Sequence, residues 1–290
     1  MSKIDPIGGQ ALIEGVMMRS STHVSLAVRS PDGTIVQERE PFTPWRKRHP
    51  ILGWPLIRGS VTLVESMIVG YRMLERSASI ATGEEEEGGG WSLLIGLVLF
   101  ILLFKALPAQ IFLSLKPLVS NTLLLNAIEG LIRMGIFLLY LGGISLLPDV
   151  RRLFEYHGAE HQVIHCQEAG KELTPENAAA FSPTHPRCGT SFLLVTLVLS
   201  ILVFSLLGRS TTLVGRVGLQ LLLLPFIAGL SYELIRLAGK AKDGSLIAKI
   251  ALVVTAPGQW LQRLTTRKAK PDQLEVAIAS LRGALEQPVS

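Results

Sequence analysis

The sequence has few of the residues that stabilise secreted or soluble proteins. Its 290 residues include only two cysteines, which are too few for a disulfide framework. Charged residues make up 18% of the chain and aromatic residues 6%, whereas hydrophobic residues make up 48%. The first twenty residues hold no apolar run of the length that a secretory signal needs. This composition argues against a soluble globular protein and favours insertion into a membrane.

The positive charge of the chain does not predict a nucleic-acid partner. The net charge is +5 and the pI is about 9.4. The basic residues flank apolar segments instead of forming one stripe, which is typical of the cytosolic loops of membrane proteins. We therefore expect contact with membrane lipid and none with nucleic acid, and the sequence leaves homo-oligomerisation open.

Four segments have the run of about twenty apolar residues that a membrane-spanning helix needs. Short connections join them in pairs, so each pair should form a helical hairpin. Basic residues crowd on one side of these spans, which predicts that both termini lie in the cytosol. The predicted fold is a mainly α-helical, multi-pass four-helix transmembrane bundle with spans at 91–115, 123–147, 190–207 and 213–237.

The first 50 residues are predicted to form a small cytosolic domain that contains a β-hairpin. Residues 23–29 and 34–40 alternate apolar and polar side chains on either side of a Pro31-Asp32-Gly33 turn. Glu14 and His23 in this domain are either site residues or solvated polar residues of the small sheet.

The remaining segments outside the spans are predicted to be peripheral. Residues 51–90 combine an amphipathic helix with an acidic, glycine-rich linker. The two transmembrane hairpins, 91–147 and 190–237, enclose a cytosolic region at 148–189. Residues 238–290 hold two further helices.

The first of these two helices, at 245–260, is interrupted by proline and glycine, so an interfacial or re-entrant helix fits it better than a fifth span. The second follows Pro271 and carries apolar residues on one face, with Asp272 as its N-cap. We expect this last helix to dock on the hairpin domain.

Three charged residues lie within or near the predicted spans, namely Lys105, Glu129 and Arg133. Charges at that depth are costly, so they are candidates for function. Glu129 and Arg133 are also four residues apart, and a local ion pair on one helix would explain them equally well.

The region 154–188 contains four of the six histidines and both cysteines. This clustering of nitrogen and sulfur ligands indicates a transition-metal site, with zinc first and iron or manganese as alternatives. Residues 150–169 read as a helix, which places His157 and His161 on one face with Cβ atoms about 6 Å apart. With Glu160 they form His-x-x-Glu-His, the reversed zinc-protease motif, in which the glutamate activates a water molecule.

Two neighbours of this motif are weaker ligand candidates. His165 lies about 12 Å along the helix axis from His157, too far for all three rings to share one metal. It either pairs with His161 or lies on the helix surface. Cys166 points to another face, where a buried free thiol is its expected role.

A second candidate pair, His185 and Cys188, lies in a proline-stiffened loop before the third span. A His-x-x-Cys pair can chelate zinc from a loop, which would complete a site with His157 and His161. Alternatively, Cys188 is a buried thiol and His185 a cap or surface residue. Glu233 ends the fourth span at the same membrane face, where it lies either beside the metal or paired with Arg236.

Six motifs spread over nearly the whole chain carry a family resemblance: GGQALIEGVMMR, WPLIRG, YHGAEH, HPRCGTSFL, LQRLTT and EVAIASL. Together they resemble the YqhQ-like family of bacterial inner-membrane proteins, which have no known function and are described as predicted metal-dependent enzymes. The resemblance implies a bacterial cytoplasmic membrane protein. It places His157, Glu160, His161, His185 and Cys188 inside shared motifs and leaves His165 outside them.

Three functions compete at this point. The favoured one is a zinc-dependent hydrolase at the inner face of the membrane, in which Glu160 activates the water and the substrate is a peptide or a lipid-linked group. The second is a non-enzymatic scaffold whose zinc fastens the cytosolic region to the bundle. The third is a channel or transporter that uses the intramembrane charges, although no inverted repeat is visible.

Overall fold

A four-stranded sheet lies at one end of the molecule. The computed structural model describes residues 7–84, 90–185, 188–208, 212–238 and 245–285. The predicted hairpin is confirmed, since two strands pair around the turn at 31–33, and two further strands precede it. The sheet is an antiparallel meander in sequence order, formed by β1 (Gly8–Leu12), β2 (Gly15–Arg19), β3 (His23–Arg29) and β4 (Ile35–Pro41).

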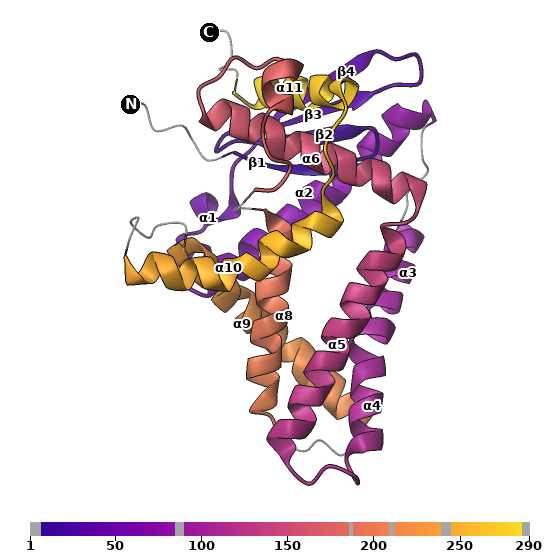
Figure 1. Cartoon of the computed structure of the whole chain (residues 1–290), viewed down its shortest axis with the longest axis vertical. Helices are drawn as coiled ribbons and strands as arrows, with labels where there is room; N and C mark the ends of the chain where they lie inside the picture. The colour runs from indigo at the N-terminus through magenta and orange to yellow at the C-terminus, as the bar shows by residue number, and fades with distance from the viewer. Residues whose placement is uncertain (1–6, 85–89, 186–187, 209–211, 239–244, 286–290) are drawn as a thin grey trace.

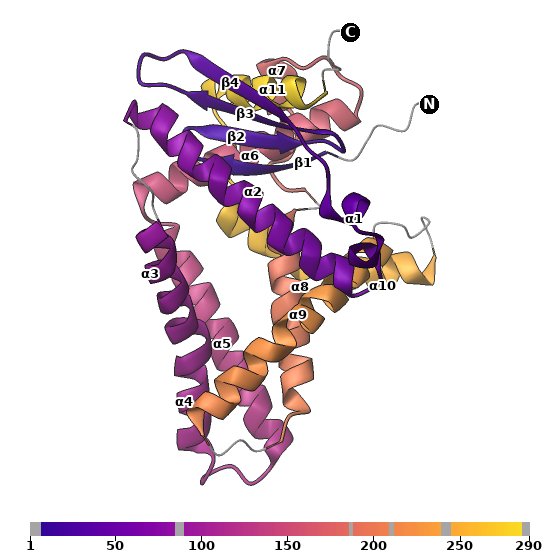
Figure 2. The same ribbon diagram turned by 180° about the vertical axis from the view of Figure 1, so that it is seen from behind.

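Both faces of this sheet are covered by helices, so the predicted small domain is larger than its 50 residues (Figures 1 and 2). One face carries α2 (Ile57–Thr82), and the other carries α6 (Pro148–Glu168) and α11 (Pro271–Leu285), with the short α7 (Pro175–Ala179) packed against these two helices. Side chains alternate between the faces, as a strand requires: Leu26 contacts the α2 layer, and Ala27 the α6 and α11 layer. We call this three-layer unit the cap.

The C-terminal helix docks on the sheet, as the sequence predicts. Leu274 and Leu281 of α11 are fully buried, and the Ser280 hydroxyl donates to the carbonyl of Ser25 in β3. The predicted N-cap is wrong, because the helix begins at Pro271 and Asp272 lies inside its first turn. Gln273 caps instead: its side-chain oxygen accepts the backbone N–H of Lys270 at 2.9 Å.

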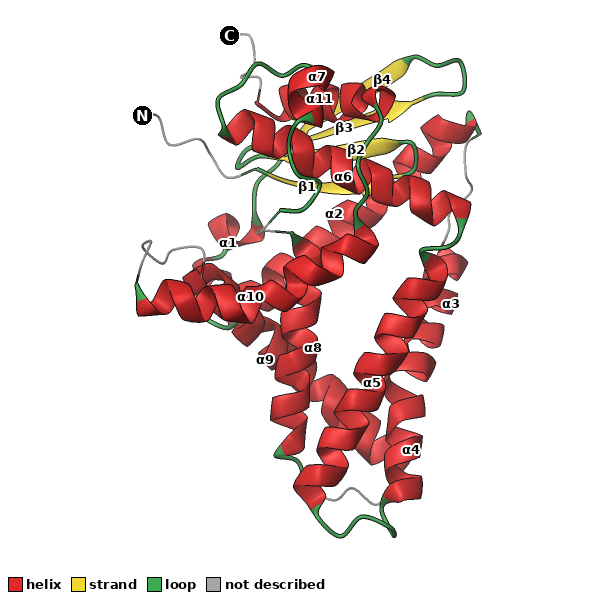
Figure 3. Ribbon diagram, in the orientation of Figure 1, coloured by secondary structure: helices red, strands yellow, loops and turns green. Residues whose placement is uncertain are grey.

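Below the cap, long apolar helices form the bundle, in which α5 and α9 slope in opposite directions (Figures 1 and 3). The first long helix is continuous from α3 (Gly90–Ile101) through a π-helical turn, η2 (Leu102–Ala106), into α4 (Leu107–Leu115). The others are α5 (Thr122–Ile144), α8 (Gly189–Ser205) and α9 (Leu213–Ala238). Residues 85–89 of the predicted acidic linker lie outside the described residues.

Three of these helices are long and apolar enough to cross a membrane: Leu94–Leu115, Thr122–Ile144 and Leu213–Leu237. The second predicted span was drawn too long, because α5 ends at Ile144 and the chain then turns into α6. The third predicted span, 190–207, corresponds to α8, which has only 17 residues. Length and composition therefore support a membrane protein with three candidate spans among the described residues.

The segment predicted as an interfacial helix forms α10 (Leu246–Thr265), which is longer than expected and lies across the junction of cap and bundle (Figure 1). It contacts α8 and α9. The connector between sheet and α2 contains two short helices, α1 (Trp45–Arg48) and η1 (Pro50–Gly53). The junction of cap and bundle is thus built from segments far apart in sequence.

Candidate metal centre

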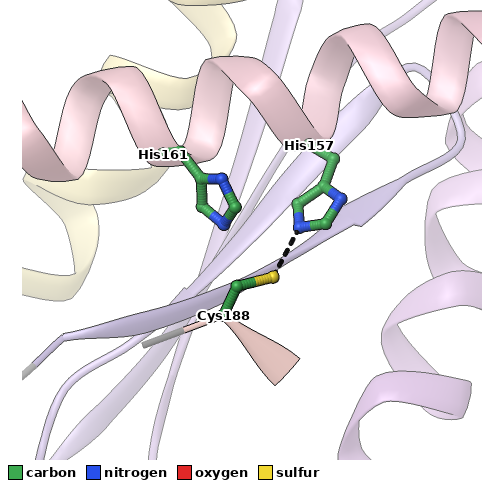
Figure 4. Close-up of side chains that lie close together, drawn as sticks. All are labelled: His157, His161 and Cys188. Carbon is green, nitrogen blue, oxygen red and sulfur yellow. Dashed lines mark hydrogen bonds between the residues drawn. The ribbon is translucent and has the colours of Figure 1, made fainter. Parts of the chain in front are cut away.

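Two histidines of α6 and one cysteine of α8 meet at the junction of cap and bundle (Figure 4). The ring centroids of His157 and His161 are 4.5 Å apart, as one helical turn predicts. Cys188 is the N-cap of α8, and its Sγ lies 3.2 Å from Nε2 of His157. The three potential ligand atoms all lie within 4.8 Å of one another. A helix N-terminus favours negative charge, which suits a thiolate at Cys188.

Hydrogen bonds orient both imidazoles for ligation. Nδ1 of His157 lies 2.8 Å from the carbonyl oxygen of Thr265, and Nδ1 of His161 lies 2.6 Å from that of Pro183. Because a carbonyl oxygen only accepts, each Nδ1 carries the proton and donates. Each Nε2 therefore has a free lone pair, the arrangement in which most metal-binding histidines are held.

A second group of potential ligands lies next to the first. His165, Glu168 and His185 also place ligand atoms within 4.8 Å of one another. The His185 ring is 4.5 Å from that of His165 and 5.7 Å from that of His161. The structure thus groups His185 with His165 and not with Cys188. Glu168 was not predicted as a ligand, although its position three residues after His165 was a usable signal.

Buried glutamines hold the loop that carries His185 and Cys188. The Gln262 side chain of α10 accepts the backbone N–H of His185 at 2.8 Å and donates to its carbonyl at 2.9 Å. From α6, Gln162 donates to the carbonyl of Phe181 and accepts the N–H of Ala269. These positioning residues were missed, because nothing in their local sequence shows which loop they contact.

A close backbone approach explains the glycine of the YHGAEH motif. A Cβ on Gly158 would lie 1.7 Å from the carbonyl oxygen of Arg267, so only glycine fits there. The same segment donates the Arg267 N–H to the carbonyl of Phe154. Gly158 therefore lets the chain after α10 lie along α6, where Thr265 reaches His157.

Glu160 lies against strand β1. Its side chain is 6% exposed and presses on Gly9, where a Cβ would lie 2.8 Å from the carboxyl carbon. Burial raises the pKa of Glu160 to about 7, although the neighbouring His157 and a hydrogen bond from the Gly9 N–H act in the opposite direction. At neutral pH this carboxyl is poised to take up or release a proton.

A cavity of about 510 Å³ joins these groups. Its wall includes backbone of β1, apolar residues of α6 and the first turn of α8. The residues that matter chemically in its lining are His157, Glu160, His161, His185 and Cys188.

Several other candidate residues lie elsewhere in the cap. Glu14 forms an ion pair with Arg152 of α6 and accepts a hydrogen bond from the Tyr156 hydroxyl at 3.3 Å. His23 contacts the Thr22 hydroxyl at the start of β3. Cys166 is buried in the core between α6 and α11, and its thiol lies 3.5 Å from the carbonyl of Glu172.

The remaining candidates lie in the bundle. Glu233 accepts hydrogen bonds from Arg58 of α2, one of them at 2.6 Å, with Arg236 at 4.0 Å. Lys105, Glu129 and Arg133 are buried together, far from the histidines. Arg216 joins them through Glu129 and was not predicted, although a charged residue inside the predicted span 213–237 gives the same signal as Lys105.

Comparisons with known proteins match the chain to a family and a relative of unknown function. Residues 54–287 match a family described as "Protein of unknown function (DUF1385)". The chain is 34% identical over 301 residues to the "Uncharacterized protein YqhQ" of Bacillus subtilis (strain 168), covering 96% of this chain and 92% of that protein. No solved structure matches the chain.

Proposed function

The chain belongs to the DUF1385 family of proteins of unknown function, and from its site we propose that it is a membrane-embedded, metal-dependent hydrolase. The observation that carries this proposal is the convergence of two unprotonated imidazole nitrogens and the Cys188 sulfur beside a buried carboxyl, Glu160. Two histidines and one thiolate fit zinc, with iron and manganese as alternatives. Three protein ligands are the number found in catalytic zinc sites, which keep a fourth position for water or substrate.

In this proposal, zinc supplies Lewis-acid activation of water and of the substrate. His157 and His161 hold the ion through Nε2, and the carbonyls of Thr265 and Pro183 keep both rings in place. Glu160 accepts the proton of the attacking water and returns it to the leaving group, a role that its pKa near 7 supports. The Gly9 N–H keeps the carboxyl oriented.

The surroundings of the site support a substrate that arrives from the bilayer. Leu153, Phe154 and Leu193 give the cavity an apolar wall. The next residue of α8, Leu194, already lines a separate apolar groove of about 210 Å³ between α8, α9 and α10. An acyl chain in that groove would bring a lipid-linked headgroup, or a membrane-associated peptide, to the cavity. Membrane lipid is thus the first partner that we propose.

We further propose that the protein lies in the bacterial cytoplasmic membrane with four spans and both termini in the cytosol. The path of the chain supports this number, because α8 leaves the cap and α9 returns to it (Figure 1). At about 1.5 Å per residue, the 17 residues of α8 are about 26 Å long, close to the hydrocarbon thickness of about 30 Å. The basic residues near the cap favour its cytosolic side.

A zinc scaffold is the second candidate, and one observation favours it. His157 belongs to the cap and Cys188 to the bundle, so an ion between them would fasten the two units together. In that case a fourth protein ligand would close the site, as in structural zinc sites.

Metal analysis combined with a Glu160→Gln variant separates the two candidates. The purified protein should contain about one zinc per chain at this site, and cobalt substitution should give a thiolate charge-transfer band that Cys188→Ala abolishes. The Glu160→Gln variant should keep its metal and the thiolate charge-transfer band of the cobalt form, but it should no longer hydrolyse chromogenic ester, phosphoester and peptide probes. Glu176→Gln, an exposed glutamate of α7, is the matched control.

Loss of zinc in Glu160→Gln would make Glu160 a ligand and contradict its proposed role. Zinc bound by four protein groups, with no probe hydrolysed by the wild type, would favour the scaffold.

A further inference from the structure

A cluster of charged side chains is buried in the bundle, at the end far from the cap. Lys105 of η2, Glu129 and Arg133 of α5 and Arg216 of α9 are each 4% exposed or less. Asn126 and Gln220 are buried beside them and hydrogen-bonded to them. We call these six residues the bundle cluster. Burying charges in a membrane domain costs free energy, so another interaction or a function must account for them.

Glu129, the single carboxylate of the cluster, cannot accept any further hydrogen bond. Its Oε1 accepts from Arg133 at 2.7 Å and from Gln220 at 2.8 Å. Its Oε2 accepts from Nε of Arg216 at 2.8 Å and also from Nη2 of the same guanidinium. A carboxylate offers about four lone-pair sites, and Glu129 uses all of them on these partners.

Two of the cationic side chains keep unused hydrogen-bond donors, although the Arg216 guanidinium pairs with Glu129 and also lies 3.2 Å from the centre of the Phe112 ring. Nη1 of Arg216 is buried and has no hydrogen-bond partner among the described residues. The Lys105 ammonium lies 5.4 Å from the centre of the Phe204 ring, and none of the ion pairs among the described residues includes it. Lys105 is held in a π-helical turn, a feature common at functional sites.

The network around Arg133 is rigid, so these groups cannot simply fold back on one another. Pro108 has no N–H to donate to the carbonyl of Phe104, four residues before it. Nε of Arg133 donates to that carbonyl instead, at 3.1 Å. On the other side, Asn126 donates to the last carbonyls of α8 and accepts from Arg216. The guanidinium groups are therefore fixed in place.

The charge of the cluster is unbalanced whatever the state of Lys105. Two arginines, which stay protonated, face one glutamate, and a protonated lysine adds a second positive charge. The segments 91–147 and 190–237 contain only one other acid, Glu233, which pairs with Arg58 near the cap. A second copy of the bundle thus has no carboxylate to offer, and the counter-charge must come from another molecule.

We propose that the bundle cluster binds a phosphate-bearing anion through Arg216 Nη1 and Lys105. Guanidinium groups match phosphate oxygens in geometry and charge, and lysine adds a point charge. Arg216 lies three residues after the start of α9, about 5 Å along its axis, so the anion sits near the membrane surface far from the cap. The phosphate belongs either to an anionic phospholipid or to a soluble phosphate.

Thermal stability and native mass spectrometry test this on the full-length protein in a neutral detergent. Phosphatidylglycerol is titrated against phosphatidylcholine, and inorganic phosphate against chloride at equal ionic strength. The melting temperature of the wild type should rise and then level off as one of the two phosphate sources is added. Saturation by phosphatidylglycerol, with about one lipid retained per chain, assigns the lipid source, and saturation by inorganic phosphate assigns the soluble one.

Variants separate a ligand site from a purely structural network. Lys105→Gln leaves the Glu129 network intact and should weaken the apparent affinity for the anion about tenfold or more. Arg236→Gln, at the cap end of the same α9, should leave it unchanged. Glu129→Gln should lower basal stability yet increase the response to the anion, because it removes the competing carboxylate.

Three results would overturn the proposal: no stabilisation by either phosphate source, equal weakening by Arg236→Gln, or an unchanged response in Lys105→Gln.

Discussion

The two buried polar clusters of this protein are opposites in their chemistry. In the cap, His157 and His161 each donate an Nδ1–H hydrogen bond to a backbone carbonyl and present Nε2 lone pairs beside the Cys188 sulfur. In the bundle, donors outnumber acceptors around Glu129. Converging lone pairs attract a cation, whereas converging donors attract an anion. Each cluster therefore indicates the sign of the partner that it lacks.

The clusters also differ in what holds them. The cap site depends on backbone carbonyls and two buried glutamines, which fix the ligands without adding charge. The bundle cluster is held by charged groups that stabilise one another. Removing one group should therefore be far more damaging in the bundle than in the cap.

The largest effect is expected from Glu129→Ala. It leaves two arginines buried without a carboxylate, which costs about 3–5 kcal/mol of unfolding free energy. Chemical denaturation in detergent measures it. Glu233→Ala, whose pair with Arg58 is partly exposed, should cost at most about 1 kcal/mol and serves as the control. Equal losses would show that the bundle cluster is no more strongly coupled than a surface pair.

The metal-free cap should lose stability as pH rises through the range where Glu160 titrates. The folded-state pKa of about 7 lies above the ordinary 4.5, so the folded protein binds more protons between these values. The contribution of Glu160 to the unfolding free energy is complete below about pH 4.5 and falls by about 3 kcal/mol as the pH rises to about 7.

Unfolding free energies of the metal-free protein from pH 4 to 8 test this, because Glu160→Gln should remove that part of the slope. Wild-type and variant curves that stay parallel would contradict the expectation.

Single histidine variants should show which ring belongs to the first metal group. His161→Ala should lower zinc affinity by more than about 100-fold, beyond the range for residues that only support a ligand. His165→Ala, which belongs to the neighbouring group, should change this affinity much less. Competition with a chelating dye measures both. Similar losses of zinc affinity in the two variants would show that the two groups form one site.

The smallest effect is expected from Gln262→Ala. It removes the hydrogen bonds that hold His185 and the start of α8 to α10. We expect zinc affinity to fall about 10- to 100-fold through the displaced Cys188 loop. Gln259→Ala, on the same helix, is the control. An unchanged affinity would mean that the loop is rigid by itself.

Local patterns predicted much of this structure. The i,i+4 spacing placed His157 and His161 side by side, because helix geometry alone fixes that contact. The alternation at 23–29 and 34–40 predicted two of the strands, and the apolar face after Pro271 predicted a docking helix. In each case the determining interaction lies within a few residues or depends on one exposed apolar face.

Contacts between distant segments were not predictable in this way. Spacing within the loop could not decide whether His185 joins Cys188 or His165, because that choice depends on how Gln262 anchors the loop. The ion pair of Glu233 with Arg236 on its own helix was predicted, but its closer partner Arg58, 175 residues away, was not. Such pairings follow from packing of whole elements, which a linear pattern does not contain.

The cap unites the beginning and the end of the chain. β3 and α11 pack together, and the carbonyl that orients His157 comes from Thr265. During synthesis, both hairpins of the bundle therefore leave the ribosome before the last pieces of the centre. A nascent chain that ends before α10 would lack the carbonyl that orients His157, so the proposed metal centre can assemble only after the last helices emerge.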